Sequence, residues 1–214
     1  MKKILTTLLI CSAFTCGLRS QISVGSHIAN INFLSGTNVH GFGFGGTYIK
    51  AFTGKFLLSA GANLYLGGKQ ETFDTAFSYS ATPPTPLLVG VTRSVFSYTG
   101  SLDFRVYVAG DAESEFGVYA MAGVGIVKGK VKTKTIDSYD QSTYQLNTPA
   151  VGNWDTFDGL SAGFGAGAEK NIGNNYLYLN AKYNYVALYF DGGLRYFAPK
   201  SYITFEFGLR HPFR

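Results

Sequence analysis

Apolar residues alternate with small or polar residues along most of this chain, and no other feature of the sequence restricts its fold as much. Successive side chains of a β-strand point to opposite faces, so alternation over about ten residues predicts a strand with one apolar face. In the segment around Asp103, for example, Phe104 and Val106 share one face while Asp103 and Arg105 share the other. Eight segments follow this pattern: residues 22–32, 40–51, 56–66, 96–108, 116–126, 160–169, 177–189 and 202–210. The first alternates only approximately, which predicts a bulge or an inexact register there.

Short and longer connections alternate along the chain between these segments. Three are tight turns, at residues 52–55, 110–114 and 171–175. Two are long and are predicted to be irregular, at residues 68–93 and 130–157, and two are intermediate, near 34–39 and 190–200. An even number of strands with short turns at one end and longer loops at the other is typical of membrane barrels. The predicted fold is therefore all-β: an eight-stranded antiparallel up-and-down transmembrane β-barrel.

Residues 1–20 are predicted to be a cleaved export signal, which leaves residues 21–214 as the barrel. Lys2 and Lys3 form a basic start, the apolar stretch runs from residue 4 to residue 14, and cleavage is predicted near Ser20. A membrane-spanning helix is one alternative, but it needs about 20 apolar residues. A lipoprotein modified at Cys16 is another, although the residues before Cys16 make a poor signal for that modification.

Removal of this segment would change the composition in ways that exclude several functions. Both cysteines, Cys11 and Cys16, would be lost, so the mature chain could form neither a disulfide nor a thiolate metal site. Lys+Arg would fall from 18 to 15 against 13 Asp+Glu, which lowers the net charge from +5 to +2. The only basic run, residues 128–134, alternates with other residues, and no nucleic-acid partner is predicted.

Alternation alone does not say whether the apolar face points outward, as in a membrane barrel, or inward, as in a soluble barrel. Three features favour the membrane barrel. The polar faces carry Gly, Ser and Asn rather than the Lys and Glu of a solvated surface. The last strand ends in an aromatic residue, Phe213. Aromatic residues also gather near both strand ends, as in interfacial girdles: Tyr48, Phe52, Phe56, Phe116 and Phe213 at the turn end, and Phe96, Tyr98, Tyr185 and Tyr189 at the loop end.

The eight amphipathic segments, the export signal and the closing stretch from Tyr202 to Phe213 resemble the small outer-membrane β-barrel proteins. That family includes the outer membrane protein A transmembrane domain and the outer membrane protein X and W barrels. The resemblance is one of pattern over the whole mature chain, and it implies the outer membrane of a Gram-negative bacterium. It also implies recognition of the last strand by the barrel-assembly machinery, although here Phe213 is penultimate and follows Pro212. The family includes structural, adhesive, transporting and enzymatic members.

With the apolar face outward, charged side chains of both signs are predicted to point into the lumen. They are Asp103, Arg105, Glu115, Glu169, Lys182, Glu206 and Arg210. An eight-stranded barrel has an interior that side chains can fill, and buried charges are tolerated when they are paired. A structural plug of ion pairs is therefore the favoured interpretation, and a path for protons or ions along the same charges is the alternative.

No catalytic, cofactor or metal site is predicted. His27 and Ser26 are neighbours on one strand, so they point to opposite faces and cannot act together. His40 lies near an outer loop and His211 near the turn end, and neither belongs to a recognisable constellation. The glycines of residues 41–46 alternate like a strand rather than forming a nucleotide-binding loop.

The segments 69–93 and 133–157 hold the remaining options, because both are rich in aromatic and apolar residues. They could bind an unidentified partner, or they could be extended hairpins with packed side chains. Three functions are therefore weighed: a plugged structural or interaction barrel that displays its loops, a narrow or lateral conduit for small hydrophobic molecules, and, least favoured, a lipid-modifying enzyme. The expected partners are outer-membrane lipid, lipopolysaccharide and the barrel-assembly machinery.

Overall fold

The computed structural model describes residues 20–33, 35–36, 38–80, 85–147, 151–189 and 197–213. The expected export signal therefore lies outside the described residues, apart from Ser20, which begins the first strand. Within the described ranges the strands are β1 (Ser20–Phe33), β2 (Asn38–Ala51), β3 (Phe56–Ser78), β4 (Pro86–Ala109), β5 (Phe116–Thr135), β6 (Tyr144–Leu146), β7 (Trp154–Asn171), β8 (Tyr176–Leu188) and β9 (Pro199–Pro212). No helix in these ranges is long and apolar enough to cross a membrane.

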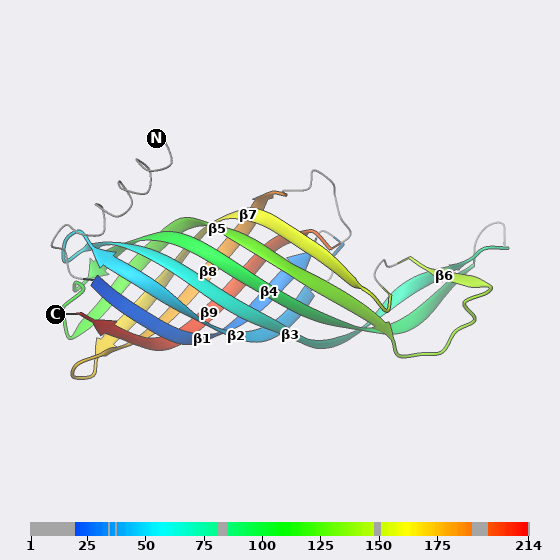
Figure 1. Ribbon diagram of the computed structural model, residues 1–214, viewed down its shortest axis with the longest axis horizontal. Helices are drawn as coiled ribbons and strands as arrows, with labels where there is room; N and C mark the ends of the chain where they lie inside the picture. The colour runs from blue at the N-terminus through cyan, green and yellow to red at the C-terminus, as the bar shows by residue number, and fades with distance from the viewer. Residues whose placement is uncertain are drawn as a thin grey trace, which may run out of the picture.

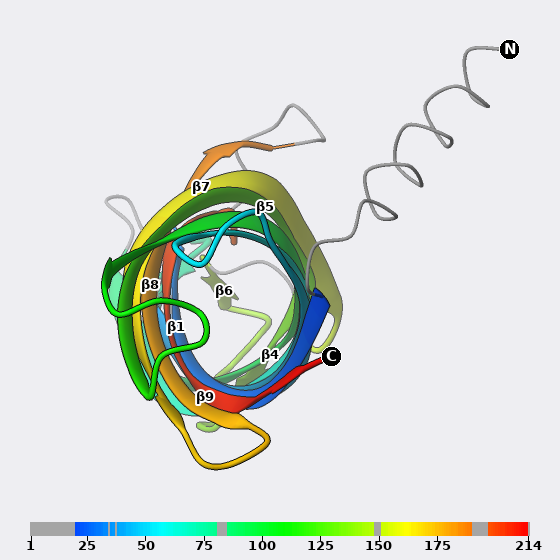
Figure 2. The same cartoon turned by 90° about the vertical axis from the view of Figure 1, so that its left-hand side faces the viewer.

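The long strands close into a ring in which each strand pairs antiparallel with its neighbours along the chain (Figures 1 and 2). β9 returns to pair with β1, and β2 pairs with β3, so the sheet has no open end. Of the nine strands in the sheet, only the short β6 lies outside the ring, which leaves eight. The predicted eight-stranded up-and-down barrel is confirmed.

The irregularity predicted for β1 occurs only at the end of the strand. The register runs without interruption from Gln21 to Asn32 against β9, with a shift only between Asn32 and Phe33, and it is continuous against β2. The alternation of β1 is imperfect because the inward face changes character halfway. Near the start of β1 this face carries Gln21 and Ser23, whereas near its end it carries the buried apolar residues Ala29, Ile31 and Phe33.

The same change explains why the segments predicted to be irregular are mostly strand. β3 and β4 pair as far as Phe77 and Pro86, and β5 continues to Thr135. Above the belt most inward residues of these strands are apolar, as Val91 and Val95 show, while the outward face mixes polar residues with exposed Phe73 and Leu88. The prediction of irregular loops was therefore wrong for residues 68–78, 86–93, 130–135, 144–146 and 154–157, which are strand, whereas the described residues 136–143 carry no strand. The strands were missed because their inward face becomes mostly apolar above the belt.

Beyond the ring, β3 and β4 continue as a projecting hairpin, which we call the distal arm (residues 71–78, 86–91 and 136–147; Figure 1, right). β6 pairs with β3 along this arm, with Leu146 opposite Ala76. Buried Ala76, Val89, Val91 and Leu146 form a small core of their own, against which Leu87, Tyr139, Tyr144 and Val151 pack. The arm is therefore a folded element and not an irregular loop.

The tight turns lie at the opposite end of the barrel from the arm, and β1 begins and β9 ends at that same end (Figure 1). The Phe213 N–H donates to the Ser20 carbonyl at 2.9 Å, which ties the start of β1 to the chain after β9. Gly110 and Gly173 have φ of 67° and 96°, values that only glycine adopts without strain, and they let two of the turns reverse sharply.

Candidate functional site

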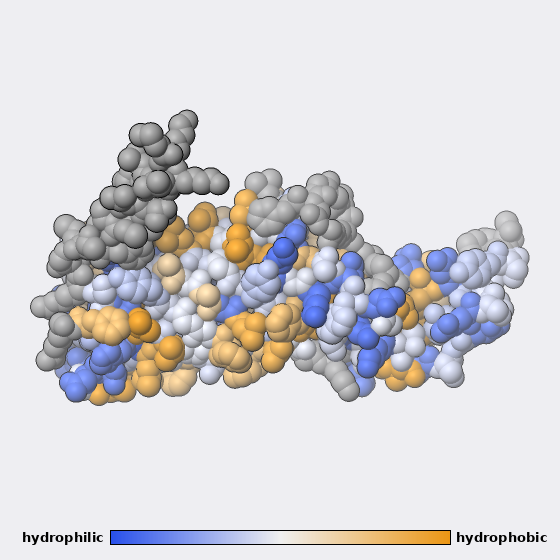
Figure 3. Space-filling view, in the orientation of Figure 1, coloured by the Kyte–Doolittle hydropathy of each residue, from blue (hydrophilic) through white to orange (hydrophobic). Residues whose placement is uncertain are grey.

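The outer wall of the barrel is apolar and exposed. Val24 and Phe164 are 58% and 66% exposed, although both are large hydrophobic residues in regular strands. The outward apolar residues of the ring include Ile22, Val24, Ile28, Phe42, Phe44, Leu66, Tyr98, Leu102, Phe104, Phe116, Val124, Ile126, Leu160, Phe164, Leu179, Tyr185, Phe205, Phe207 and Leu209. Figure 3 shows many of them as orange patches along the barrel wall, while blue residues dominate toward the arm. Water-soluble monomers rarely expose a continuous apolar surface of this extent.

The height of this apolar belt can be followed on β5. Its outward residues run from Phe116 through Val124 to Ile126, and the next outward residue is Lys128. Ten steps of about 3.3 Å, on a strand tilted by about 40°, rise by roughly 25 Å. This is about the height of the apolar band on known membrane barrels, which is also about 25 Å.

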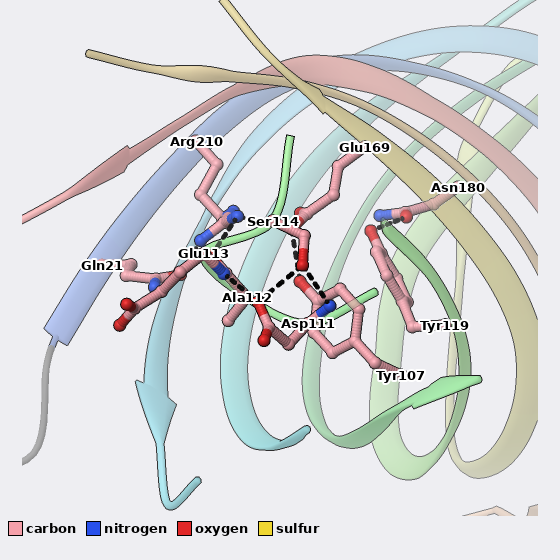
Figure 4. A network of polar contacts seen from close by, with 10 residues as sticks. All are labelled: Gln21, Tyr107, Asp111, Ala112, Glu113, Ser114, Tyr119, Glu169, Asn180 and Arg210. Atoms are coloured by element: carbon pink, nitrogen blue, oxygen red, sulfur yellow. Dashed lines mark hydrogen bonds and ion pairs between the residues drawn. The ribbon is translucent and has the colours of Figure 1, made fainter. Parts of the chain in front are cut away.

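The turn end of the lumen is closed by a buried ion pair between Arg210 and Glu169, whose side chains are each 1% exposed (Figure 4). The Tyr107 hydroxyl donates to Glu169, and Arg210 also donates to the Gln21 side chain. The Arg210 guanidinium lies 3.8 Å from the centre of the Tyr176 ring. A charge buried this deeply is stable only because each partner satisfies the other.

The turn between β4 and β5 folds across this mouth (Figure 4). Arg210 donates to the Ala112 carbonyl at 3.1 Å, and the Ala112 N–H donates to the Gly54 carbonyl at 2.8 Å. Ala112 is consequently only 3% exposed, although it lies in a turn. Ala112 is part of an apolar layer that fills this end of the lumen. The layer consists of Ile49, Leu57, Tyr107, Ala112, Tyr119 and Met121.

Asp111 holds this turn in shape. Its carboxylate accepts from the Glu113 N–H at 2.9 Å and from the Ser114 hydroxyl at 2.8 Å. These donors, the Glu113 backbone first, lower the pKa of the Asp111 carboxyl, because they stabilise its charged form. The turn therefore stays ordered while Asp111 is ionised.

A polar chamber occupies the middle of the lumen. Asp103 pairs with Lys182, and the Arg105 Nε donates to the Ser59 hydroxyl at 3.2 Å. Glu206 accepts from Tyr178 at 2.8 Å and from Asn180 at 3.1 Å. A cavity of about 40 Å³ remains between these groups. A water needs about 10–15 Å³, so the chamber has room for only a few waters.

The loop end of the lumen is closed by a larger apolar core. It consists of Ala29, Ile31, Phe33, Val39, Tyr65, Val95, Val127, Val131, Phe157, Val186, Phe197 and Tyr202. Phe33 contacts Phe157 and Phe197 edge-on, with ring centres 5.4 and 5.8 Å away. Tyr189, predicted in the outer girdle, packs against this core and donates to the Pro199 carbonyl at 3.0 Å. Within the described residues, the polar chamber is thus enclosed between two apolar layers.

Six of the seven charged residues assigned to the lumen face the interior, in two groups. Glu169 and Arg210 form the pair at the turn end, while Asp103, Arg105, Lys182 and Glu206 surround the chamber. The assignment of Glu115 was wrong. Glu115 is exposed, because β5 begins only at Phe116 and Glu115 belongs to the preceding turn, where the strand alternation does not apply.

Two buried cations were missed. Arg93 is 2% exposed, pairs with Asp74 at 2.5 Å and lies over the Phe197 ring at 5.7 Å, at the base of the arm. Lys50, near the end of β2, is 6% exposed. Arg93 lies between Val91 and Val95 on the same face of the strand. Extending the alternation to residues before 96 would therefore have predicted that Arg93 points inward.

The histidines lie apart from one another. His27 is buried in the lumen, 5% exposed and stacked on Tyr65 with ring centres 6.3 Å apart, while its neighbour Ser26 points outward. His40 is exposed, and the His211 ring contacts the Asn175 side chain at 2.8 Å on the surface. No two of the three histidines therefore belong to a common site.

Comparisons with known proteins give the fold a context. No protein-family model matches the sequence, and no curated protein matches it. Among solved structures, Neisserial surface protein A has a TM-score of 0.51 at 12% identity, over 90% of this chain and 95% of that chain. A major outer membrane protein of Thermus thermophilus has a TM-score of 0.50 at 11% identity, over 91% and 99%. The attachment invasion locus protein of Yersinia pestis gives 0.46 at 14% identity, over 92% and 100%.

At these identities the likeness shows the fold alone. The fold is that of the small bacterial outer-membrane barrels, and the resemblance predicted from the sequence is confirmed at this level.

Proposed function

We propose that this chain is an outer-membrane protein whose closed barrel anchors and displays the distal arm. The observation that carries the proposal is a lumen filled at both ends, inside a wall whose outer surface is apolar over roughly 25 Å. A closed sheet pairs its backbone groups internally, as hydrocarbon requires. The barrel in this proposal is a support and not a channel.

The arm supplies the interaction surface. One of its faces is covered by the small core around Leu146, while the other exposes Phe73 and Leu88, which are 70% and 68% exposed. Phe73 pairs with Gly90, and Thr75 pairs with Leu88, so the two side chains lie on the same face of the hairpin. Contiguous exposed apolar patches mark interaction sites, and the proposal assigns that role to this face of the arm.

The short turns, the start of β1 and the end of β9 face the periplasm in this proposal, and the arm faces outward. The proposed partners in the envelope are outer-membrane lipid with lipopolysaccharide and the barrel-assembly machinery, which would read the β9 end near Phe213. No catalytic activity is part of the proposal.

Gel migration tests the membrane barrel, because such barrels migrate differently before and after boiling. Identical migration, together with solubility in the absence of detergent, would rule the placement out. Reactivity on whole cells tests the orientation. Ser80→Cys beside the arm should react with a membrane-impermeant maleimide on intact cells, whereas Ser114→Cys in the turn should react only after the outer membrane is permeabilised.

Planar-bilayer recordings test the closed lumen against a conduit. The purified chain should show no steady conductance, because apolar layers around Phe157 and Tyr119 pack in the lumen on either side of the polar chamber. A stable open state would contradict the support function and would favour the conduit.

A further inference from the structure

The outward face of β5 changes abruptly from apolar to basic. After Val124 and Ile126, the next four outward residues are Lys128, Lys130, Lys132 and Lys134, which we call the lysine ladder. On the inward face they alternate with Val127, Gly129, Val131 and Thr133, of which Val127 and Val131 are fully buried. The lysines are therefore held on the outside of the wall by a regular strand with a packed core behind it.

The ladder begins where the apolar belt ends. With about 3.3 Å per residue and a tilt of about 40°, Lys128 lies roughly 5 Å above Ile126, and each further lysine lies roughly 5 Å higher. The polar headgroup layer of a bilayer is about 5–8 Å thick on each side of the hydrocarbon. Lys128 thus lies at headgroup level and Lys130 just above it. Lys132 lies about 15 Å above Ile126, and it reaches that level by extending its long side chain down along the surface.

The two central lysines have no acid beside them on the neighbouring strands. Lys130 lies opposite Phe96 and Thr156, and Lys132 lies opposite Ser94 and Trp154. Within the described part of the chain, no ion pair involves any lysine of the ladder. Asp155 on β7 lies opposite Val131 and therefore shares the inward face, away from the lysines. On the outward face, Asp158 lies opposite Lys128 and diagonal to Lys130, and Glu71 lies two strands from Lys134.

Aromatic rings flank the central pair. The Lys130 ammonium lies 4.7 Å from the Trp154 ring centre and 5.7 Å from the Phe96 ring centre. Trp rings of this amphipathic kind favour the interface between lipid and water. Lys130 and Lys132 are two residues apart on one strand, roughly 7 Å, so both ammonium groups can reach a single phosphate.

We propose that the lysine ladder, with Lys130 and Lys132 at its centre, binds the phosphate groups of anionic lipid in the outer leaflet around the barrel. This rests on the proposed membrane placement and assigns a phosphate-binding site on the barrel to the lipid partner named there. A soluble polyanion would need no apolar belt directly below the charges and no tryptophan among them. Lipid provides both, because acyl chains would contact Val124 and Ile126 while the phosphate contacts the lysines.

The test uses the purified full-length chain in zwitterionic detergent micelles, titrated with diphosphorylated lipid A and followed by native mass spectrometry. The unaltered chain should retain the lipid, and Lys130→Gln/Lys132→Gln should bind it at least tenfold more weakly, since each lysine near an anionic surface contributes about fivefold. Lys55→Gln/Lys170→Gln is the matched control, because it removes two exposed lysines at the turn end, and it should bind as the unaltered chain does. Dephosphorylated lipid A should bind all three chains weakly and equally.

Equal retention of diphosphorylated lipid A by all three chains would overturn the proposal, as would an equal affinity of the ladder for a soluble polyphosphate. Heat-modifiable migration and flotation with phosphatidylcholine vesicles are measured on the same samples. A chain that folds and floats but binds lipid A independently of the lysines refutes the lysine site alone. A chain that does not float refutes the membrane placement.

Discussion

Arg210 connects more parts of the barrel than any other side chain described above. Its guanidinium donates to Gln21 on β1, to the carbonyl of Ala112 in a turn and to Glu169 on β7. Both members of the ion pair are almost completely buried. Removing one charge of such a pair leaves the other without compensation, which costs more than removing both.

Arg210→Met alone should therefore lower the free energy of unfolding by about 3–5 kcal/mol. Arg210→Met/Glu169→Gln should recover much of that loss, since Gln is neutral and still accepts the Tyr107 hydroxyl. The measurement is urea unfolding in vesicles, with Lys170→Gln on the surface as control. If the double variant is less stable than the single one, the pair is not the source of the effect.

A second prediction for a single residue concerns Asp140, in the segment between β5 and β6. The hydroxyls of Ser142 and Thr143 donate to its carboxylate at 2.6 and 2.5 Å, which lowers the pKa of Asp140 to about 2. Because the folded pKa is depressed, the contribution of this turn to stability is complete above the unfolded pKa of about 4. It is lost as the pH falls toward 2.

The carboxyl carbon of Asp140 should accordingly titrate near pH 2 in an NMR pH series. Ser142→Ala/Thr143→Val removes both hydroxyl donors and should move the midpoint up toward the ordinary Asp value. An unchanged midpoint in that variant would show that the hydroxyls do not set it.

At the scale of elements, β5 shows what could be predicted from the sequence and what could not. In its belt segment, residues 116–126, the apolar residues stay on the same face throughout. The position of the segment follows from this periodicity, and its outward face follows from the rule that a membrane barrel turns its apolar residues toward the lipid. Above Ile126 the two faces exchange character, and the position of that change depends on which neighbouring strands continue and on what fills the lumen. These are contacts between distant segments, which a local pattern does not contain.

The same reasoning applies to the candidate site. The inward direction of Asp103, Arg105 and Arg210 follows from alternation. The pairing of Arg210 with Glu169 rather than with Glu206 depends on the stagger of strands around the ring, and Asp74 became the partner of Arg93 only because β3 continues beyond the belt. The prediction that Glu115 points into the lumen was wrong because residues of a turn do not follow the two-residue alternation of a strand.

The belt itself gives a prediction on β5. Ala122 is outward and exposed near the middle of the belt, so Ala122→Arg should destabilise the barrel by about 2–4 kcal/mol in vesicles. Thr156→Arg is the matched control, since Thr156 is outward on the adjacent strand above the belt, and its effect should stay within about 0.5 kcal/mol. Denaturant unfolding in vesicles gives both values, and equal effects would contradict the assigned belt.

The whole molecule consists of two parts with separate cores. The ring is held by layers around Tyr119 and Phe157, while the arm packs around Leu146, which is 8% exposed. Parts with separate cores can open independently when one is destabilised.

Leu146→Asp should therefore unfold the arm and leave the barrel intact. Limited proteolysis should cut the variant within residues 71–91 or 136–147 and leave a protected core, while heat-modifiable migration stays as in the unaltered chain. Gln145→Asp, exposed and next to Leu146 on the same strand, is the control and should remain resistant. Loss of heat-modifiable migration in the Leu146 variant would show that arm and barrel fold as one unit.

The pairing of β9 with β1 has a consequence for how the chain is made. β9 is the last strand of the ring along the chain, so until Pro199–Pro212 is available both β1 and β8 have an edge of unpaired backbone groups. Such edges are templates for pairing with other chains. A nascent or truncated chain is thus prone to aggregate for the whole interval before closure, and barrel formation depends on keeping that unfinished chain apart from its copies until its final strand arrives.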